Sequence, residues 1–365
     1  MKLLYITNGI NGAGGLERVL SVKATYLAEH YGYEVTILSL NDHQLHPFYV
    51  FSGKIKMLSI LVKGNSLQYV TSYIKGIKKI VAQEQPDVIS VCDDGLKGFF
   101  LPILLGKSIP IIYERHASID LNFSTEDSNC IATLKKYVLH QLMQKLARSF
   151  DAFVVLTNGN LKEWSADNVK VIPNPISFYS KQSALLNSKK VIAVGSHSYN
   201  KGYDLLLQAW KIIIRIHSDW KLEIYGKKDN KGNFVELAEH LRLSDSVTFF
   251  EPIQNIEEKY LNSSIMVLPS RSEGFGMVLI EAMACGVPCV SFDCPQGPAD
   301  IITDDVDGLL VNNGNVEALS QAILNLIENE NLRKTMGVKA KENVKRYLPE
   351  TIIKQWDELF KELQR

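Results

Sequence analysis

Residues 268–290 have the sequence LPSRSEGFGMVLIEAMACGVPCV. The apolar run that leads into Pro269 predicts a buried strand, and the composition of Met277–Ala284 predicts a helix. Between them, Gly274-Phe275-Gly276 lets the backbone approach a ligand closely, because glycine has no side chain. The start of the helix offers free N–H groups and a partial positive charge. The segment therefore predicts a loop that binds a diphosphate.

Two carboxylates flank this loop. Glu273 precedes the predicted helix, and Glu281 lies in its second turn. Each carboxylate can accept hydrogen bonds from hydroxyl groups at opposite ends of one ligand, which suits a nucleotide sugar. Taken alone, the pattern fits an exposed loop acid beside a capping acid equally well.

Short apolar runs alternate with helical patterns on both sides of this segment. This alternation predicts an α/β protein with two Rossmann-like, doubly wound domains in series. Pro173, Pro175 and the polar residues 180–190 predict a linker between the domains. The predicted strands are Leu3–Thr7, Glu34–Leu40, Asp87–Cys92, Ile109–Glu114, Phe153–Leu156, Val169–Ile172, Val191–Gly195, Lys221–Tyr225, Val247–Phe250, Ile265–Pro269, Pro288–Phe292 and Gly308–Val311.

The bulk composition excludes several classes of protein. A chain of 365 residues suits two domains of roughly 150–200 residues each. Its formal net charge of zero gives no overall field that attracts nucleic acid. The sequence contains no run of about 18 apolar residues, so no membrane span is predicted. The five cysteines match no zinc pattern and indicate small buried side chains in a reducing cytoplasm.

Seven residues separate Glu273 from Glu281. This E-x7-E spacing lies within Pro-Ser-x-x-Glu-Gly-Phe-Gly and is followed by Glu-Ala-Met-Ala-x-Gly-x-Pro-x-Val. The arrangement resembles the signature of family 4 glycosyltransferases. The similarity extends to Gly14-Gly15-Leu16-Glu17-Arg18, Val171-Ile172-Pro173-Asn174-Pro175, Val194-Gly195, Asn200-Lys201-Gly202 and Gln296-Gly297-Pro298.

The resemblance implies a retaining enzyme of the GT-B fold, with two Rossmann-like domains facing a deep cleft. Residues 1–180 would form the N-terminal, acceptor-binding domain, joined by a C-terminal helix over residues 350–365. Residues 187–349 would form the C-terminal domain that binds the nucleotide-sugar donor.

Roles for the signature residues also follow from the resemblance. Glu281 would hold the donor ribose, and Glu273 the hydroxyls of the transferred sugar. The backbone N–H groups of the loop and of the first helical turn would contact the donor sugar and cradle the diphosphate. The residues expected to do so are Gly274, Phe275, Gly276, Met277 and Val278.

Lys201 would neutralise the departing diphosphate, so it is expected to be catalytic together with Glu273 and His116. His116 follows the predicted strand Ile109–Glu114, where the resemblance implies a histidine beside the donor sugar. A loop histidine bonded to the backbone is the alternative. No metal ion is expected, because a helix dipole and Lys201 can stabilise the leaving group.

Further donor contacts are implied at Gly14, Gly15, Gly195 and Gly226. Similar enzymes usually have an arginine after the glycine at position 195, but this chain has Ser196 and His197. Either His197 replaces the arginine as a phosphate ligand, or Lys201 and the helix N–H groups suffice.

The segment Lys54–Lys79 contains six lysines and no acidic residue. Its apolar residues recur at helical spacing, which predicts a basic amphipathic surface. Such a surface could contact the inner leaflet of a membrane or a lipid-linked acceptor. A core-facing apolar stripe with a solvated lysine face is an equally good interpretation.

We therefore expect a cytoplasmic enzyme, either free or peripheral on the membrane. It would transfer a hexose or N-acetylhexosamine from a nucleotide sugar, with a UDP-sugar as the expected donor. The acceptor would be a glycan or a lipid-linked molecule in bacterial surface polysaccharide synthesis. The alternatives are a nucleotide-sugar epimerase and a non-catalytic sugar-nucleotide-binding protein.

Overall fold

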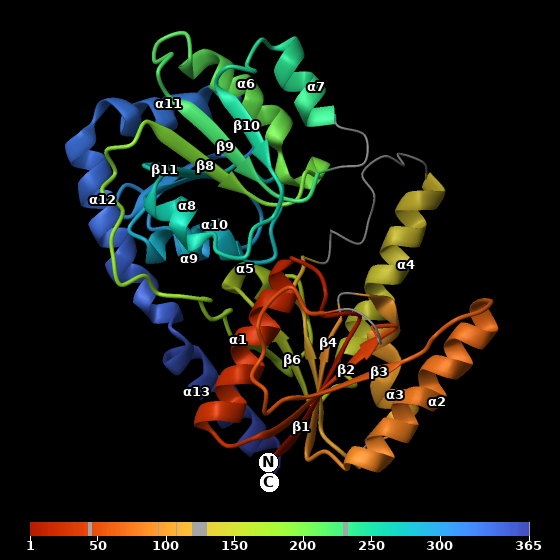
Figure 1. Cartoon of the computed structure of the whole chain (residues 1–365). Helices are drawn as coiled ribbons and strands as arrows, with labels where there is room; N and C mark the ends of the chain where they lie inside the picture. Colours follow the sequence, from red (N-terminus) through yellow and green to blue (C-terminus); the bar gives the residue numbers. More distant parts are fainter. Residues whose placement is uncertain (43–45, 94, 107, 119–129, 229–232, 365) are drawn as a thin grey trace. The chain divides into compact units, whose positions relative to one another are not determined.

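The computed structural model describes residues 1–42, 46–93, 95–106, 108–118, 130–228 and 233–364. The chain divides into two compact units (Figure 1). The first comprises Met1–Pro175 together with Pro349–Arg365, and the second comprises Ile176–Leu348. Each unit is built around one parallel sheet.

The sheet of the first unit has seven strands in the order β3-β2-β1-β4-β5-β6-β7. The chain runs outward from β1 to β2 and β3, then returns beside β1 as β4. A topological switch point therefore lies between β1 and β4. The strands are β1 (Lys2–Thr7), β2 (Glu34–Leu40), β3 (Lys56–Ile60), β4 (Val88–Cys92), β5 (Ile111–Glu114), β6 (Ala152–Val155) and β7 (Val169–Val171).

Helices cover both faces of this sheet (Figure 1). The 3-10 helix η1 (Leu96–Phe100), α2 (Ser66–Glu84), α3 (Leu101–Leu105) and α4 (Cys130–Ala147) pack on one face through residues such as Tyr73, Ile77, Phe99 and Met143. On the other face, α1 (Gly15–His30) contacts α13 (Pro349–Leu363). The short α5 (Asn158–Leu161) follows β6. Side chains alternate between the two faces along each strand. Because helices cover both faces, the strand residues on both faces are apolar.

The sheet of the second unit has six strands in the order β10-β9-β8-β11-β12-β13. They are β8 (Lys190–Val194), β9 (Lys221–Tyr225), β10 (Val247–Phe250), β11 (Ile265–Leu268), β12 (Cys289–Asp293) and β13 (Gly308–Asn312). Its main apolar core joins strand residues such as Val191 and Ile265 to Leu206 and Trp210 of α6 and Leu319 of α11.

The helices of the second unit are η3 (Tyr199–Lys201), α6 (Tyr203–Ile213), α7 (Asn233–His240), α8 (Glu257–Leu261), α9 (Met277–Ala284), α10 (Pro298–Ile301), α11 (Val316–Glu328), α12 (Glu330–Asn343) and η4 (Val344–Tyr347). In Figure 1, α6, α7 and α11 lie on one side of the sheet, and α9 and α10 lie on the other. In the described part of the chain, no helix is both long enough and apolar enough to cross a bilayer.

The strands predicted from the sequence are all present within a few residues, but β3 (Lys56–Ile60) was not predicted. The first residues of the lysine-rich segment Lys54–Lys79 therefore pair with β2 as an edge strand and do not belong to a helix. Only α2 carries the helical part of that segment.

Candidate functional site

The glycine loop of the second unit connects the carboxyl end of β11 to α9. Gly276 caps α9 with φ of 103°, a left-handed conformation that favours glycine, and no side chain caps this end. Glu273 is buried in the loop, with 8% of its surface exposed. The loop therefore presents backbone N–H groups and one anchored carboxylate at the same point.

Lys201 is brought directly to this loop. Its Nζ lies 2.6 Å from Oε1 of Glu273, although the two residues are 72 positions apart. The stem of Lys201 passes Gly195, where a β-carbon would lie 3.3 Å from two of its carbons. Lys201, Glu273 and Gly195 thus meet at the carboxyl edge of the sheet, where ligands bind in this class of fold.

Glu281 lies in the second turn of α9 and is 2% exposed. The hydroxyl of Ser177 donates to its Oε1 at 3.1 Å, and the hydroxyl of Tyr260 donates to its Oε2 at 3.5 Å. A buried carboxylate with two hydroxyl donors already has the kind of partners that ribose hydroxyls would provide. The sequence did not point to Ser177 or Tyr260.

The loop is held by contacts that the sequence analysis also missed. Arg271 forms a bidentate pair with Asp204 at 2.9 and 2.7 Å and stacks over the ring of Tyr199 at 3.8 Å. The amide of Asn200 donates to the carbonyl of Ser272 at 2.7 Å. These contacts tie the glycine loop to η3 and α6, so the approach of Lys201 to Glu273 is fixed from both sides.

Ser196 and His197 have different environments. Ser196 is exposed after β8. His197 is only 4% exposed, and its ring packs edge-on against Tyr203, Phe234 and Phe249. Of the two positions, the exposed serine is therefore better placed to reach a ligand from solvent.

Gly226, the residue after β9, allows two strand ends to approach each other. A β-carbon there would lie 1.8 Å from the carbonyl oxygen of Gly195. Any other residue would push these two loops apart. Gly226 therefore shapes the edge of the sheet at which Lys201 lies.

A buried thiol lies near the same charges. Cys294 is 3% exposed. Burial, reinforced by the negative charge of Glu273, raises the pKa of the Cys294 thiol to about 12. The thiol is therefore neutral at physiological pH, which agrees with a packing role.

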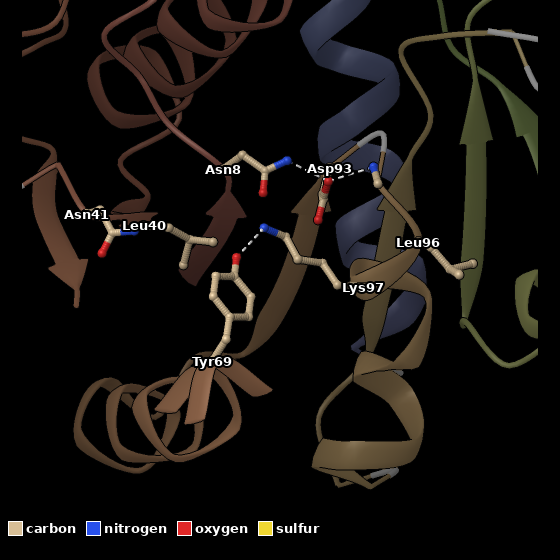
Figure 2. A pocket seen from close by; sticks show the side chains of 8 residues that line it. Asn8, Leu40, Asn41, Tyr69, Asp93, Leu96 and Lys97 are labelled. Atoms are coloured by element: carbon tan, nitrogen blue, oxygen red, sulfur yellow. Dashed lines mark hydrogen bonds between the residues drawn. The ribbon is translucent and has the colours of Figure 1, made fainter. Parts of the chain in front are cut away.

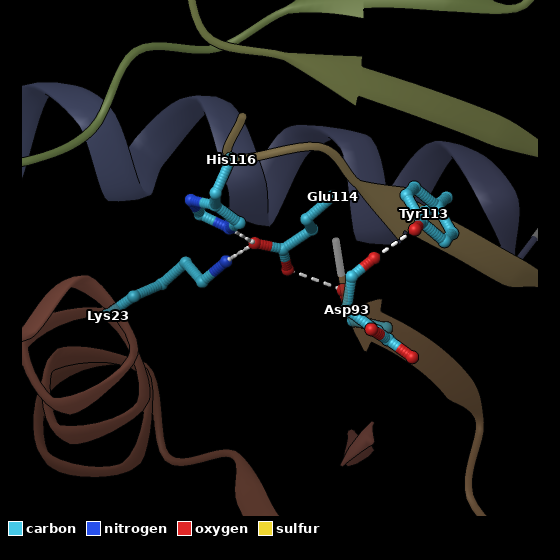
Figure 3. Close-up of polar contacts among 6 residues, drawn as sticks. Lys23, Asp93, Tyr113, Glu114 and His116 are labelled. Atoms are coloured by element: carbon cyan, nitrogen blue, oxygen red, sulfur yellow. Dashed lines mark hydrogen bonds and ion pairs between the residues drawn. The ribbon is translucent and has the colours of Figure 1, made fainter. Parts of the chain in front are cut away.

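The first unit contains a buried polar network around Glu114, the last residue of β5 (Figure 3). The ammonium of Lys23 from α1 and Nε2 of His116, at 3.3 Å, both contact Oε2 of Glu114. The hydroxyl of Ser90 donates to Oε1 at 2.5 Å. Lys23 also lies 3.9 Å from the ring centroid of Trp356 on α13. His116 is therefore anchored to a side-chain network.

This network lowers the pKa of Glu114. Burial alone would raise the pKa, but the charge of Lys23 and the hydrogen bond with His116 outweigh it and hold the pKa at about 2. Cys92, Glu114 and His116 also place one potential ligand atom each within 4.8 Å of one another. The Lys23 ammonium binds the same carboxylate, so a metal cation there would face a second positive charge.

Asp305 and Asp307 have an Asp-x-Asp spacing, in which two carboxylates could bind a metal ion. Asp307 is fully buried, and it accepts hydrogen bonds from the backbone N–H of Thr303 and the amide of Asn343, both at 2.7 Å. These contacts close the turn before β13, so this carboxylate serves the structure of the turn.

Gly14 ends the exposed loop after β1, and Gly15, also exposed, is the first residue of α1, which begins without a side-chain cap. The carboxylate of Glu17 folds back beneath this loop, and a β-carbon on Gly14 would lie 2.5 Å from it. Burial is the main reason that the pKa of Glu17 is raised. Gly14, Gly15 and His116 belong to the first unit, whereas the other expected donor contacts belong to the second.

A cavity of about 500 Å³ opens in the first unit (Figure 2). It is lined by Asn8, Leu40, Asn41, Tyr69, Asp93, Gly95, Leu96 and Lys97. Sequence reasoning singled out none of these residues for such a role.

The structure shows where the apolar residues of the lysine-rich segment Lys54–Lys79 pack. Tyr73 and Ile77 are buried in the core of the first unit, and Tyr69, Ile74 and Ile80 pack against it. The interpretation of a core-facing apolar stripe is therefore confirmed for this stripe. The six lysines, Lys54, Lys56, Lys63, Lys75, Lys78 and Lys79, are exposed.

Family models match both halves of the chain. A model described as Glycosyltransferase Family 4 matches residues 13–178, and one described as Glycosyl transferases group 1 matches residues 176–343. An uncharacterized glycosyltransferase of Haemophilus influenzae is 30% identical over 97% of this chain and 98% of its own length. The amylovoran biosynthesis glycosyltransferase AmsD of Erwinia amylovora is 31% identical over 98% of this chain and 99% of its own.

Solved structures agree with the fold. Sucrose-phosphate synthase from Thermosynechococcus elongatus has a TM-score of 0.84 at 18% identity, over 100% of this chain and 99% of that one. The Anabaena protein Alr3699/HepE, in complex with UDP and glucose, has a TM-score of 0.79 at 17% identity, over 99% of both chains.

Two parallel α/β sheets of this kind, with a glycine loop leading into α9, are those of the GT-B fold. The chain belongs to glycosyltransferase family 4.

Proposed function

We propose that the chain transfers a hexose or an N-acetylhexosamine from a UDP-sugar to a glycan or lipid-linked acceptor. This proposal rests mainly on the contact of Lys201 with Glu273, in the loop that leads into α9. No side chain caps the start of this helix. When a donor binds, its diphosphate can replace Glu273 as the partner of Lys201. The carboxylate is then released to bind sugar hydroxyls, while the N–H groups of Met277 and Val278 bind the diphosphate.

The relatives support the choice of donor and acceptor. The Anabaena structure contains UDP and glucose, and the Erwinia relative is named for the synthesis of amylovoran. We therefore propose a UDP-sugar donor and a role in bacterial surface polysaccharide synthesis.

We further propose that the anomeric configuration of the sugar is retained. In this mechanism the leaving diphosphate oxygen accepts the proton of the acceptor hydroxyl on the same face of the sugar. His116, fixed by Glu114, contacts the sugar close to the reacting carbon. A trapped glycosyl adduct on an enzyme side chain would refute this mechanism.

The first test is calorimetric titration with UDP, GDP and ADP in the presence of EDTA. UDP is expected to bind to the wild type, and Lys201→Met is expected to weaken binding about tenfold or more, because a charge-assisted contact is lost. Lys189→Met is a matched control, since Lys189 is an exposed lysine paired with Asp219 on the surface of the same unit. Absence of nucleotide binding to folded protein would refute the donor site.

Transfer is then measured with UDP-sugars and a panel of acceptors, and the anomeric configuration of the product is determined by NMR. Release of an epimerised free sugar without an acceptor would instead identify an epimerase. Donor binding without turnover on any acceptor would support the non-catalytic alternative.

We also propose peripheral contact with the cytoplasmic face of a membrane through Lys54–Lys79. Exposed lysines lie there beside exposed apolar side chains, including Leu67 at 75% and Val70 at 50% exposure. Sedimentation with phosphatidylglycerol vesicles tests this contact. Binding should fall with added salt and with Lys75→Glu, and it should be absent on phosphatidylcholine vesicles.

A further inference from the structure

The 500 Å³ cavity of the first unit lies where parallel α/β sheets bind ligands. Asn8 follows β1, Asn41 follows β2 and Asp93 follows β4, so the cavity opens at the carboxyl ends of three neighbouring strands. It also lies at the switch point between β1 and β4. A smaller cavity of about 200 Å³ lies at the opposite edge, beside Lys2 and Glu34, where this rule predicts no ligand.

The positively charged ammonium of Lys97 lies at the wall of this cavity. Its Nζ donates to the hydroxyl of Tyr69 at 3.2 Å (Figure 2). The same atom lies 5.8 Å from the ring centroid of Tyr69 and 5.6 Å from that of Tyr73. Among the described residues, no carboxylate forms an ion pair with it. The ammonium has three N–H donors, so donors remain for a ligand after the contact with Tyr69.

Asp93 provides a fixed negative group in the lining of the same cavity. Its Oδ1 accepts hydrogen bonds from the amide of Asn8 at 2.6 Å and from the N–H of Gly95 at 2.7 Å. The hydroxyl of Tyr113 donates to its backbone carbonyl. Asn8 is itself exposed, and the bond with Asp93 fixes the direction of its amide.

The chemistry of the lining selects a class of ligand. A cation and a carboxylate face the same space, so an anion such as phosphate would gain from Lys97 but be repelled by Asp93. Neutral hydroxyl groups can donate to the carboxylate and accept from the ammonium and the amide. The side chain of Leu40 adds apolar wall, against which the C–H face of a sugar ring can pack.

The cavity is also close to the candidate catalytic histidine in the topology of the sheet. Cys92 of β4 pairs with Glu114 of β5, so Asp93 and His116 follow neighbouring strand ends. The hydroxyl of Ser90 on β4 links the two strands through its bond to Glu114.

From these observations we infer that the cavity is a sugar subsite for the acceptor, in which Asn8, Tyr69, Asp93 and Lys97 bind neutral hydroxyl groups. This inference rests on the proposed glycosyl transfer and specifies the part of the acceptor that the first unit recognises.

Saturation-transfer NMR of the full chain, with and without UDP, tests the inference. The probes are methyl glycosides of glucose, galactose, mannose and N-acetylglucosamine, with inorganic phosphate and glycerol 3-phosphate as competitors. At least one glycoside should bind to the wild type, and Lys97→Met should weaken its binding about tenfold or more. Tyr69→Phe removes only the hydroxyl that holds Lys97 and should weaken binding less.

Lys170→Met is the matched control, because Lys170 forms a surface pair with Glu362 on another edge of the same unit. It should leave glycoside binding unchanged. Glycoside binding that is equal in Lys97→Met and the wild type would overturn the inference. So would the absence of any glycoside signal from the wild type, or displacement of the glycosides by millimolar phosphate.

UDP titration of the same samples separates this inference from the proposed function. Lys97→Met should bind UDP as tightly as the wild type, since Lys97 belongs to the first unit. Loss of glycoside binding with UDP binding intact supports the subsite, whereas failure of the wild type to bind UDP counts against the proposed donor site alone.

Discussion

Replacing Glu114 with glutamine should destabilise the first unit strongly. The substitution keeps the shape of the side chain but leaves the ammonium of Lys23, which is 1% exposed, without its counter-charge. Removing one partner of a buried ion pair costs about 3–5 kcal/mol. The low pKa of Glu114 leads to a figure of the same order. A carboxyl whose pKa is about 2 in the folded state, against an ordinary 4.5, stabilises folding by roughly 3 kcal/mol at neutral pH.

The measurement is urea denaturation at pH 7, with hydrogen exchange followed by mass spectrometry to locate the loss. Amides of β5 and α1 should lose protection, while those of β8 and β11 in the second unit should keep it. Glu362→Gln is the control, because its pair with Lys170 is exposed and should contribute less than about 1 kcal/mol.

The double substitution Glu114→Gln with Lys23→Met distinguishes a stranded charge from a lost packing contact. Removing both charges should recover much of the lost stability, because no buried ion is left without a partner. If Glu114→Gln costs no more than Glu362→Gln, or if the double variant is less stable than Glu114→Gln, the reasoning about this network is wrong.

Three further predictions concern pH, a glycine and a histidine. The pKa of Glu114 is lower in the folded than in the unfolded state, so ionised Glu114 stabilises the fold fully above about pH 5, and this contribution is lost as the pH falls towards 2. Denaturation curves from pH 7 to 2.5 should show this loss in the wild type and not in Glu114→Gln. Gly226→Ala places a β-carbon 1.8 Å from a backbone oxygen and should cost about 3 kcal/mol by thermal unfolding, whereas Gly53→Ala, which meets no atom within 4 Å, should be neutral. His197→Phe should keep its aromatic packing and bind UDP within about twofold of the wild type by calorimetry, and a tenfold loss would show that the imidazole contacts the nucleotide.

Much of the fold follows from the sequence because the central strands are buried on both faces. Continuous apolar runs such as β4 (Val88–Cys92) and β11 (Ile265–Leu268) cannot be mistaken for solvent-exposed segments. The edge strand β3 was missed, since its burial is mixed and it contains Lys56 and the exposed Met57. An edge strand pairs on one side only, and its sequence therefore carries a weaker signal.

The candidate site was predictable only where its residues are close in sequence. Glu273, the glycines and α9 follow one another, so their spacing could be interpreted directly. The pair of Arg271 with Asp204 joins residues 67 positions apart, and that of Lys23 with Glu114 joins residues 91 apart. A charged residue on a helix such as α1 is usually solvated, and nothing in the local pattern indicates that Lys23 has a distant, buried partner.

The packing of α13 on the first unit has a consequence for biosynthesis. Trp356 covers the Lys23 ammonium, and Asp357 accepts a hydrogen bond from the hydroxyl of Tyr33 at 2.8 Å. A ribosome delivers these two residues only after the whole of Ile176–Leu348 has been synthesised. The first unit, although most of it is made earlier, therefore lacks a wall of its core until the second unit has been synthesised. Chaperones that bind exposed apolar surface during translation should accordingly associate longest with the amino-terminal part of the chain.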